Sequence, residues 1–380
     1  MHPRDLLPLY LSAQIHMERG DSGKAIQLIE SILHAAPESE ATETALKHAQ
    51  ETLPASRRLV RSMTGHADAV NEIYLSRNGR YVLSGSEDNT LKLWSVDKGV
   101  CMRTFTGHSD SIESVALNTD GSYALSASRD RSWRLWDVSS AASLGVFRGS
   151  DATVTAVRIS RDSEYAVTGG ADGVVRLWNI ASKKCERQFE GHKAIINAVG
   201  ISRDRTRLMS GSRDGALRIW DAATAECLVT LPGHEGSVRA AWLSPCSRYV
   251  VSGSDDGTAR LWDTREETCL RVFTGHAGWI NSVSMSFDSR FVVTGGKDAT
   301  VRLWDVSNGR CIRTYEGHEG AVRSVDLSRD LLNVVSAGQD RSIKVWAVAM
   351  KNVFVAPFAM CQAQRSDTAL SAETRFRHHL

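Results

Sequence analysis

Residues 274–315 read TGHAGWINSVSMSFDSRFVVTGGKDATVRLWDVSNGRCIRTY, and this 42-residue pattern recurs along most of the 380-residue chain. Tryptophan marks the period at Trp94, Trp136, Trp178, Trp220, Trp262, Trp304 and Trp346. Aspartate keeps the same interval at Asp88, Asp130, Asp172, Asp214, Asp256, Asp298 and Asp340. Histidine does so at His66, His108, His192, His234, His276 and His318, with Ser150 in the remaining place. A fixed period of this size indicates a repeat architecture.

One repeat contains four short stretches with the character of β-strands. WINSVSMS alternates apolar with small or polar residues, and FVVTGG, VRLWDV and CIRTY are short apolar runs separated by turns. These four strands form an antiparallel sheet that cannot bury both of its faces alone. Seven such sheets arranged radially bury each sheet against its neighbours. The sequence therefore predicts an all-β fold, a seven-bladed β-propeller. The glycines near Gly169, Gly211 and Gly295 are interpreted as turn residues at strand ends.

The Gly-His pair, the Asp of the second turn and the Trp-Asp pair resemble the WD40 repeat over residues 58–348. This resemblance implies a hydrogen-bonded network in each blade, because a buried carboxylate and a buried indole both need partners. In the sixth and fifth blades the network residues would be His276, Thr294, Asp298 and Trp304, and His234, Ser252, Asp256 and Trp262. Blade 3 has Gly149-Ser150 in place of the Gly-His pair, and Asn179 in place of the Asp that follows the Trp. We expect its network to be incomplete and the blade to be weaker.

The two ends of the repeat array indicate how the ring closes. The segment RRLVRSMTGH, residues 57–66, matches in register the strand that precedes each Gly-His pair. Nothing precedes it to which such a strand could belong, so residues 58–63 are predicted to complete the seventh blade. The competing stretch after Trp346 contains Pro357, and proline costs a ladder hydrogen bond within a strand.

Two segments lie outside the repeats. Residues 1–56 have helical spacing, and Gly20-Asp21, Ala25, Ile29 and Pro37 resemble a tetratricopeptide helical hairpin. One such hairpin cannot bury its own apolar stripe and is expected to dock on another surface. The expected domains are a small α-helical segment over 1–56, the propeller over 57–348 and a partly helical or disordered tail over 349–380. The tail ends in SAETRFRHHL, which suits a fragment of a longer protein or a frayed terminus.

Composition restricts the class of protein. There is no apolar run of roughly 18 residues and no secretory leader, so we expect a cytoplasmic protein that does not span a membrane. The net charge of +2 argues neither for nor against nucleic acid. No C-x-x-C pair is present, and no metal or cofactor is expected. Five cysteines on the repeat are interpreted as buried, reduced thiols: Cys101, Cys185, Cys227, Cys269 and Cys311.

The recurring Ser, His and Asp residues could suggest a hydrolase triad. A nucleophile is unique and lies in a cleft, whereas this set recurs beside a packed tryptophan in nearly every unit. The units also contain no insertion that could build a catalytic site. We therefore expect no catalytic residues and interpret the protein as non-catalytic.

Function is expected on the surface that the resemblance identifies as the top face. The positions that vary there lie three and five residues after the His and one before the turn Asp, and they are expected to be free of the demands of the fold. The predicted partner-binding residues are Trp279, Lys297, Arg239, Arg213, Arg323, Arg129, Glu113 and Asn281. An exposed Trp beside Arg is typical of an interface anchor, and the excess of basic residues favours an acidic segment of a protein or peptide partner. The alternative is that these are solvated loop residues.

A second basic set lies two residues before each repeat tryptophan. Its members are Lys92, Arg134, Arg176, Arg218, Arg260, Arg302 and Lys344. Their repetition favours a structural role, with the stems on the neighbouring blade and the charged heads in water. A protein-interaction scaffold is the leading hypothesis. The alternatives are a nucleic-acid or polyanion binder that uses basic rings, although nucleic acid is a less favoured partner, and a regulatory or sensor module of a larger signalling enzyme.

Overall fold

The computed structural model describes residues 59–149 and 151–348. Within those residues it contains strands β1 to β28 and no helix. The helical segment expected over residues 1–56 and the tail expected over 349–380 lie outside the described residues.

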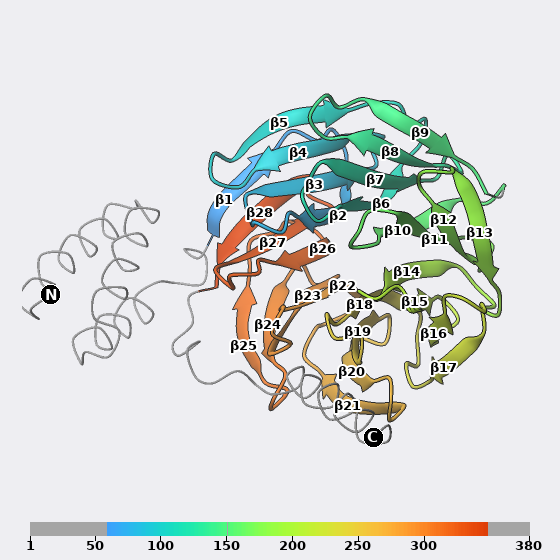
Figure 1. Cartoon of the computed structure of the whole chain (residues 1–380). Helices are drawn as coiled ribbons and strands as arrows, with labels where there is room; N and C mark the ends of the chain where they lie inside the picture. The colour runs from blue at the N-terminus through green and yellow to red at the C-terminus, as the bar shows by residue number, and fades with distance from the viewer. Residues whose placement is uncertain (1–58, 150, 349–380) are drawn as a thin grey trace, which may run out of the picture.

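The strands form seven four-stranded antiparallel sheets, numbered here as blades 1 to 7 along the chain (Figure 1). Blade 1 contains β2 (Val70–Leu75), β3 (Tyr81–Ser86), β4 (Leu91–Ser95) and β5 (Val100–Phe105). Blade 2 contains β6 (Ile112–Leu117), β7 (Tyr123–Ser128), β8 (Trp133–Asp137) and β9 (Ser143–Phe147). Blade 3 contains β10 (Val154–Ile159), β11 (Tyr165–Gly170), β12 (Val175–Asn179) and β13 (Lys184–Phe189). Blade 4 contains β14 (Ile196–Ile201), β15 (Arg207–Ser212), β16 (Leu217–Asp221) and β17 (Cys227–Leu231).

The remaining blades repeat this arrangement, and the last takes one strand from the beginning of the chain. Blade 5 contains β18 (Val238–Leu243), β19 (Tyr249–Ser254), β20 (Ala259–Asp263) and β21 (Thr268–Phe273). Blade 6 contains β22 (Ile280–Met285), β23 (Phe291–Gly296), β24 (Val301–Asp305) and β25 (Cys311–Tyr315). Blade 7 contains β26 (Val322–Leu327), β27 (Asn333–Gly338), β28 (Ser342–Ala347) and β1 (Leu59–Thr64). The predicted seven-bladed propeller is confirmed.

The first strand of each blade is the innermost one and contacts the first strands of both neighbouring blades. Strand β2 lies against β6 on one side and against β26 on the other, so the ring is closed. The sheets therefore surround a central channel, and each strand after the first lies further from the axis (Figure 1).

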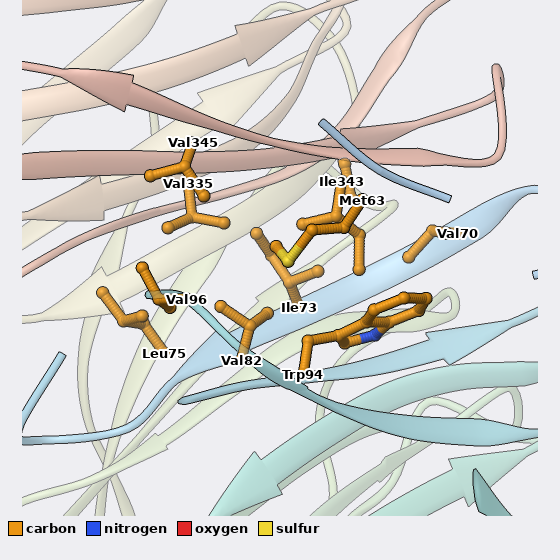
Figure 2. Packing of buried hydrophobic residues seen from close by; sticks show 11 residues of the cluster. Met63, Val70, Ile73, Leu75, Val82, Trp94, Val96, Val335, Ile343 and Val345 are labelled. Carbon is orange, nitrogen blue, oxygen red and sulfur yellow. The ribbon is translucent and has the colours of Figure 1, made fainter. Parts of the chain in front are cut away.

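The predicted closure by the N-terminal strand is also confirmed. Strand β1 pairs antiparallel with β28, and Met63 lies opposite Ile343 in the register. Met63 is 1% exposed and belongs to an apolar cluster with Ile73 and Trp94 of blade 1 (Figure 2). Backbone pairing thus makes β1 part of the seventh blade, and apolar side chains hold that blade against the first.

Apolar side chains from two successive blades fill each space between sheets, and glycines allow the sheets to approach. A Cβ atom on Gly295 of β23 would lie 2.6 Å from Val322 and 2.8 Å from Val325 of blade 7. Gly169 and Gly211 lie inside strands and face the next blade in the same way. The interpretation of these glycines as turn residues is therefore wrong, because close packing between blades excludes a larger side chain there.

Candidate interaction surface

The network that repeats in six of the seven blades fixes the turn between the second and third strands of the blade. In blade 6 the imidazole Nδ1 of His276 lies 3.0 Å from the Asp298 carboxylate, and its Nε2 lies 2.7 Å from the Thr294 hydroxyl. The Trp304 indole N–H donates to that same hydroxyl over 2.9 Å. Blade 5 has the corresponding bonds among His234, Asp256, Ser252 and Trp262, at 2.7 to 2.8 Å.

These bonds suit a neutral histidine with its proton on Nδ1. The indole then donates to the hydroxyl, the hydroxyl donates to Nε2, and Nδ1–H donates to the carboxylate, so each proton has one acceptor. Burial lowers the pKa of His276, in agreement with a neutral ring. Burial alone would raise the pKa of Asp298, but the Ala277 amide and His276 outweigh it and lower that pKa. The Ser, His and Asp residues are therefore saturated by structural bonds and lie against a packed indole.

Blade 3 departs from this pattern where its repeat lacks the histidine. Its Trp178 indole still donates to Thr168 over 2.9 Å. The turn carboxylate of Asp172 pairs with Arg176, whose Nη2 lies 2.7 Å away. A guanidinium thus faces the carboxylate that histidine faces in the other six blades. The network bonds that blade 3 was expected to lack are therefore partly replaced by an ion pair that the sequence pattern did not indicate.

The basic set two residues before each tryptophan is structural, but its position differs from the prediction. The heads of Arg134, Arg218 and Arg260 lie 5.7 to 5.9 Å from the ring centroids of the tryptophans in their own blades. The Arg134 guanidinium also donates to the Gly107 carbonyl over 2.7 Å. None of the seven is an exposed residue. The prediction of stems on the neighbouring blade and heads in water is therefore wrong, because the indole and the strand before Gly-His cover the heads.

The cysteine interpretation needs a similar correction. Cys101, Cys185, Cys227, Cys269 and Cys311 have free thiols, but four of them are exposed and Cys185 is half-buried. Each lies in the outermost strand of its blade, opposite the repeat tryptophan in the register, as Cys269 is opposite Trp262. The outermost strand has no further strand beyond it, so side chains there remain accessible to solvent.

The top face, at the N-terminal end of the innermost strands, carries one cluster built around Trp279. This residue precedes β22 and is 41% exposed. The Lys297 ammonium lies 4.0 Å from the centroid of its ring, and the Arg239 guanidinium carbon lies 4.5 Å from it. The Lys297 amide also donates to the Trp279 carbonyl over 2.8 Å. Two cations from adjacent blades therefore hold one exposed indole in place.

The charge of this cluster is only partly neutralised. Arg239 pairs with Asp255 of its own blade. Within the described ranges, Lys297 and Arg213 have no carboxylate partner. Arg213 lies at the corresponding turn of blade 4, and it is exposed. The cluster thus combines an apolar ring with net positive charge.

The other predicted residues of the top face are used elsewhere. Arg323 bridges to Glu87 of blade 1 over 2.6 Å, and Arg129 pairs with Glu113 in blade 2 over 2.7 Å. The Asn281 amide donates to the Val322 carbonyl of blade 7 over 2.9 Å, so it joins two blades. These residues lie on the same face, but among the described members of the set it is Lys297 and Arg239 that contact the Trp279 ring.

The position of Asn281 shows what sequence reasoning missed. Asn71 and Asn197, at the same place in blades 1 and 4, donate to the Ile112 and Val238 carbonyls over 2.8 to 2.9 Å. Thr155 in blade 3 likewise donates to the Ile196 carbonyl. Positions that vary along the repeat are therefore not all free of the fold. The recurrence of amide and hydroxyl side chains at this place was the available signal.

Within the part of the chain that the structure describes, no cluster of three or more His, Cys, Asp or Glu side chains could hold a metal ion. None of the described segments is a helix long and apolar enough to cross a bilayer. The compartment stays a prediction.

The closed ring of four-stranded blades and the His-Asp-Ser/Thr-Trp network define a WD40-type β-propeller. The family model described as "IFT122 first beta-propeller" matches residues 53–305, and the chain belongs to this family. The model described as "WD domain, G-beta repeat" matches residues 309–347.

Curated relatives match over short segments. The chain is 49% identical over 43 residues to the small ribosomal subunit protein RACK1 of Dictyostelium discoideum, covering 11% of this chain and 13% of that protein. The protein of the same name from Caenorhabditis elegans is 48% identical over 46 residues, 12% of this chain and 14% of its own length. Striatin-3 of Rattus norvegicus is 37% identical over 46 residues, 12% of this chain and 6% of its own length. The chain thus spans at most 14% of the length of these relatives.

Proposed function

We propose that this propeller is a non-catalytic scaffold that binds an acidic segment of a partner protein at the Trp279 cluster. The observation that carries the proposal is the exposed indole held between Lys297 and Arg239. A tryptophan fixed in this way loses little conformational freedom on binding, and Trp and Arg are enriched at the residues that dominate binding energy.

The positive charge of the Trp279 cluster favours an acidic partner. A carboxylate-bearing segment would find the Lys297 ammonium without a competing ion pair among the described residues, and Arg213 at the turn of the blade beyond Arg239. An apolar residue of the segment would lie on the exposed part of the indole. Two other predicted cations of this face, Arg129 and Arg323, are already paired with Glu113 and Glu87, and they would contribute mainly to shaping the approach.

The relatives agree with a role in assemblies. One of the matched proteins is by its name a component of the small ribosomal subunit. A repeat fold whose polar residues are used in structural bonds presents its surface, rather than a cleft with reactive groups, to other molecules.

The test uses peptides selected on the full chain from a random displayed library. We expect acidic peptides with an apolar residue to be enriched, and Trp279→Ala to weaken their binding by roughly 30-fold, the effect of losing a dominant interface residue. Lys297→Glu should weaken peptide binding more at low salt than at high salt, because salt screens the attraction between the Lys297 charge and the acidic peptide.

Phe287→Ala is the matched control, since Phe287 is 45% exposed, follows the same strand β22 and lies beside the Arg329 guanidinium. It should leave peptide binding unchanged. Selection of peptides without acidic character, or equal affinity of wild type and Trp279→Ala for the selected peptides, would overturn the proposal.

A further inference from the structure

The turn after the innermost strand has the same three-residue pattern in four blades. It reads Ser-Arg-Asn or Ser-Arg-Asp at residues 76–78, 160–162, 202–204 and 328–330. In each turn the serine hydroxyl donates to the side-chain oxygen of the third residue over 2.6 to 2.8 Å. That oxygen also accepts the amide two residues further on, at 3.0 to 3.1 Å. The first and third side chains thus stabilise the turn, and the middle arginine takes no part in it.

These four arginines meet at one place, which we call the lower mouth of the channel. Arg77, Arg161, Arg203 and Arg329 are all exposed, and all four line a single cavity of about 280 Å³ where the innermost strands end. Among the described residues, none of the four guanidinium groups is paired with a carboxylate. Four unneutralised cations therefore surround the axis of the ring.

The arginines are close enough to affect one another. Partial burial, followed by the charges of Arg161 and Arg77, lowers the pKa of Arg203. Partial burial, followed by the charges of the other three, lowers the pKa of Arg329. This repulsion is a cost to the free protein, and an anion at the lower mouth would remove it.

The walls of the cavity offer little competing negative charge. Asp326 lines it, but its carboxylate is buried and accepts the Leu75 and Leu327 amides and the Ser284 hydroxyl over 2.8 to 2.9 Å. Burial raises the pKa of Asp326, so its charge is disfavoured. Phe287 also lines the cavity, and the Arg329 guanidinium lies 3.8 Å from its ring centroid. The aromatic ring holds one of the four cations in place.

We propose that the lower mouth of the channel is a binding site for a compact anion with several phosphate groups, held by Arg77, Arg161, Arg203 and Arg329. Guanidinium groups bind phosphate oxygens in a bidentate manner, and a phosphate carries more charge per volume than a carboxylate. The cavity has the size of a small-molecule pocket, and a chain of two to four phosphates could reach cations on opposite sides of it. A long strand of nucleic acid would need a basic track beyond the mouth, whereas these cations converge on one point.

This site is separate from the Trp279 cluster. Trp279 precedes β22 and Phe287 follows it, so the two residues lie at opposite ends of one strand, about 25 Å apart at the rise of an extended chain. A loss of peptide binding at the Trp279 cluster therefore does not contradict anion binding at the lower mouth. The reverse also holds.

The experiment measures binding of tripolyphosphate to the full chain by titration calorimetry at 150 mM salt, with inorganic phosphate for comparison. We expect tripolyphosphate to bind at least tenfold more tightly than inorganic phosphate. Arg203→Glu with Arg329→Glu should lower its affinity by at least tenfold, and Arg203→Gln with Arg329→Gln should lower it less, because the glutamines remove charge without inverting it.

The matched control is Lys184→Glu with Arg187→Glu, which makes the same change in net charge at two exposed residues of the outer strand β13. It should change the affinity by less than twofold. Equal losses in this control and in the glutamate variant would show attraction by net charge alone and overturn the proposal. The absence of measurable tripolyphosphate binding would also overturn it. So would a 20-nucleotide single strand that binds more tightly than tripolyphosphate and loses its affinity only in the arginine variants.

Discussion

Met63 of β1 lies opposite Ile343 of β28, so a residue from the start of the ring is buried inside the blade formed by its end. This pairing makes the seventh blade depend on both ends of the repeat array. A propeller has no core shared by all blades, and the junction between blades 7 and 1 is the place where the chain must meet itself. Packing at this junction should therefore contribute strongly to stability.

Replacing Met63 with alanine tests that dependence. Met63 is 1% exposed, and removing a buried methionine side chain costs about 2–5 kcal/mol through lost burial and the cavity left behind. We expect this loss in the free energy of unfolding, measured by urea denaturation followed by tryptophan fluorescence. Met102→Ala is the control, because Met102 is 48% exposed in β5 and its truncation should cost less than about 0.5 kcal/mol. Similar midpoints for the two variants would mean that β1 does not hold the ring closed.

The sequence predicted the ring and its closure because both depend on a strict period. Every repeat tryptophan falls on the 42-residue interval, and residues 57–66 match the preceding strand in register. Strand order followed from the number of strands per unit and the absence of insertions. The structure added no element that this reasoning lacked within the described residues.

Side-chain direction and convergence were not predictable in the same way. The cysteines are exposed because their strand is the last of each blade, and periodicity does not say which strand is outermost. Asn281 joins two blades although its position varies along the repeat. The four arginines of the lower mouth share one repeat position with Thr119, Pro245 and Phe287 of the other three blades, so the sequence shows an incomplete set and the ring is needed to show that its members converge.

The buried histidines of the network give a pH dependence with a definite sign. Burial lowers the pKa of four of them below the ordinary value of 6.5, namely His108, His192, His234 and His276. In the unfolded chain these histidines bind protons below that value, whereas in the folded protein they stay neutral to lower pH. Their contribution to stability is therefore complete above pH 6.5 and is lost as the pH falls from there to their folded pKa values.

We expect the free energy of unfolding to decrease between pH 7.5 and 5.5, with each of these histidines contributing a slope of up to about 1.4 kcal/mol per pH unit. The network aspartates add a second decrease below their ordinary value of 3.8, because their pKa values are also lowered in the fold, as for Asp298. Urea denaturation at a series of pH values measures both. A His276→Gln variant should show a shallower slope than the wild type, and stability that rises on acidification would refute a neutral network.

The ion pair between Arg176 and Asp172 in blade 3 predicts an unequal response of two equivalent arginines. Arg176 and Arg218 occupy the same position in blades 3 and 4, and methionine retains most of the apolar stem of either. Only Arg176 faces a turn carboxylate at 2.7 Å, whereas the carboxylate in blade 4, that of Asp214, is bonded to His192 over 2.8 Å. The blade 3 pair is only partly shielded from solvent: Asp172 is an exposed residue, and the side-chain exposures are 10% for Arg176 and 25% for Asp172.

Arg176→Met should therefore destabilise the protein by about 1 kcal/mol more than Arg218→Met, since it removes the ion pair to Asp172 while the blade 4 carboxylate keeps its histidine. Thermal unfolding followed by circular dichroism compares the two variants under the same conditions. Equal melting temperatures for the two variants would show that Arg176 does not replace the missing histidine in blade 3.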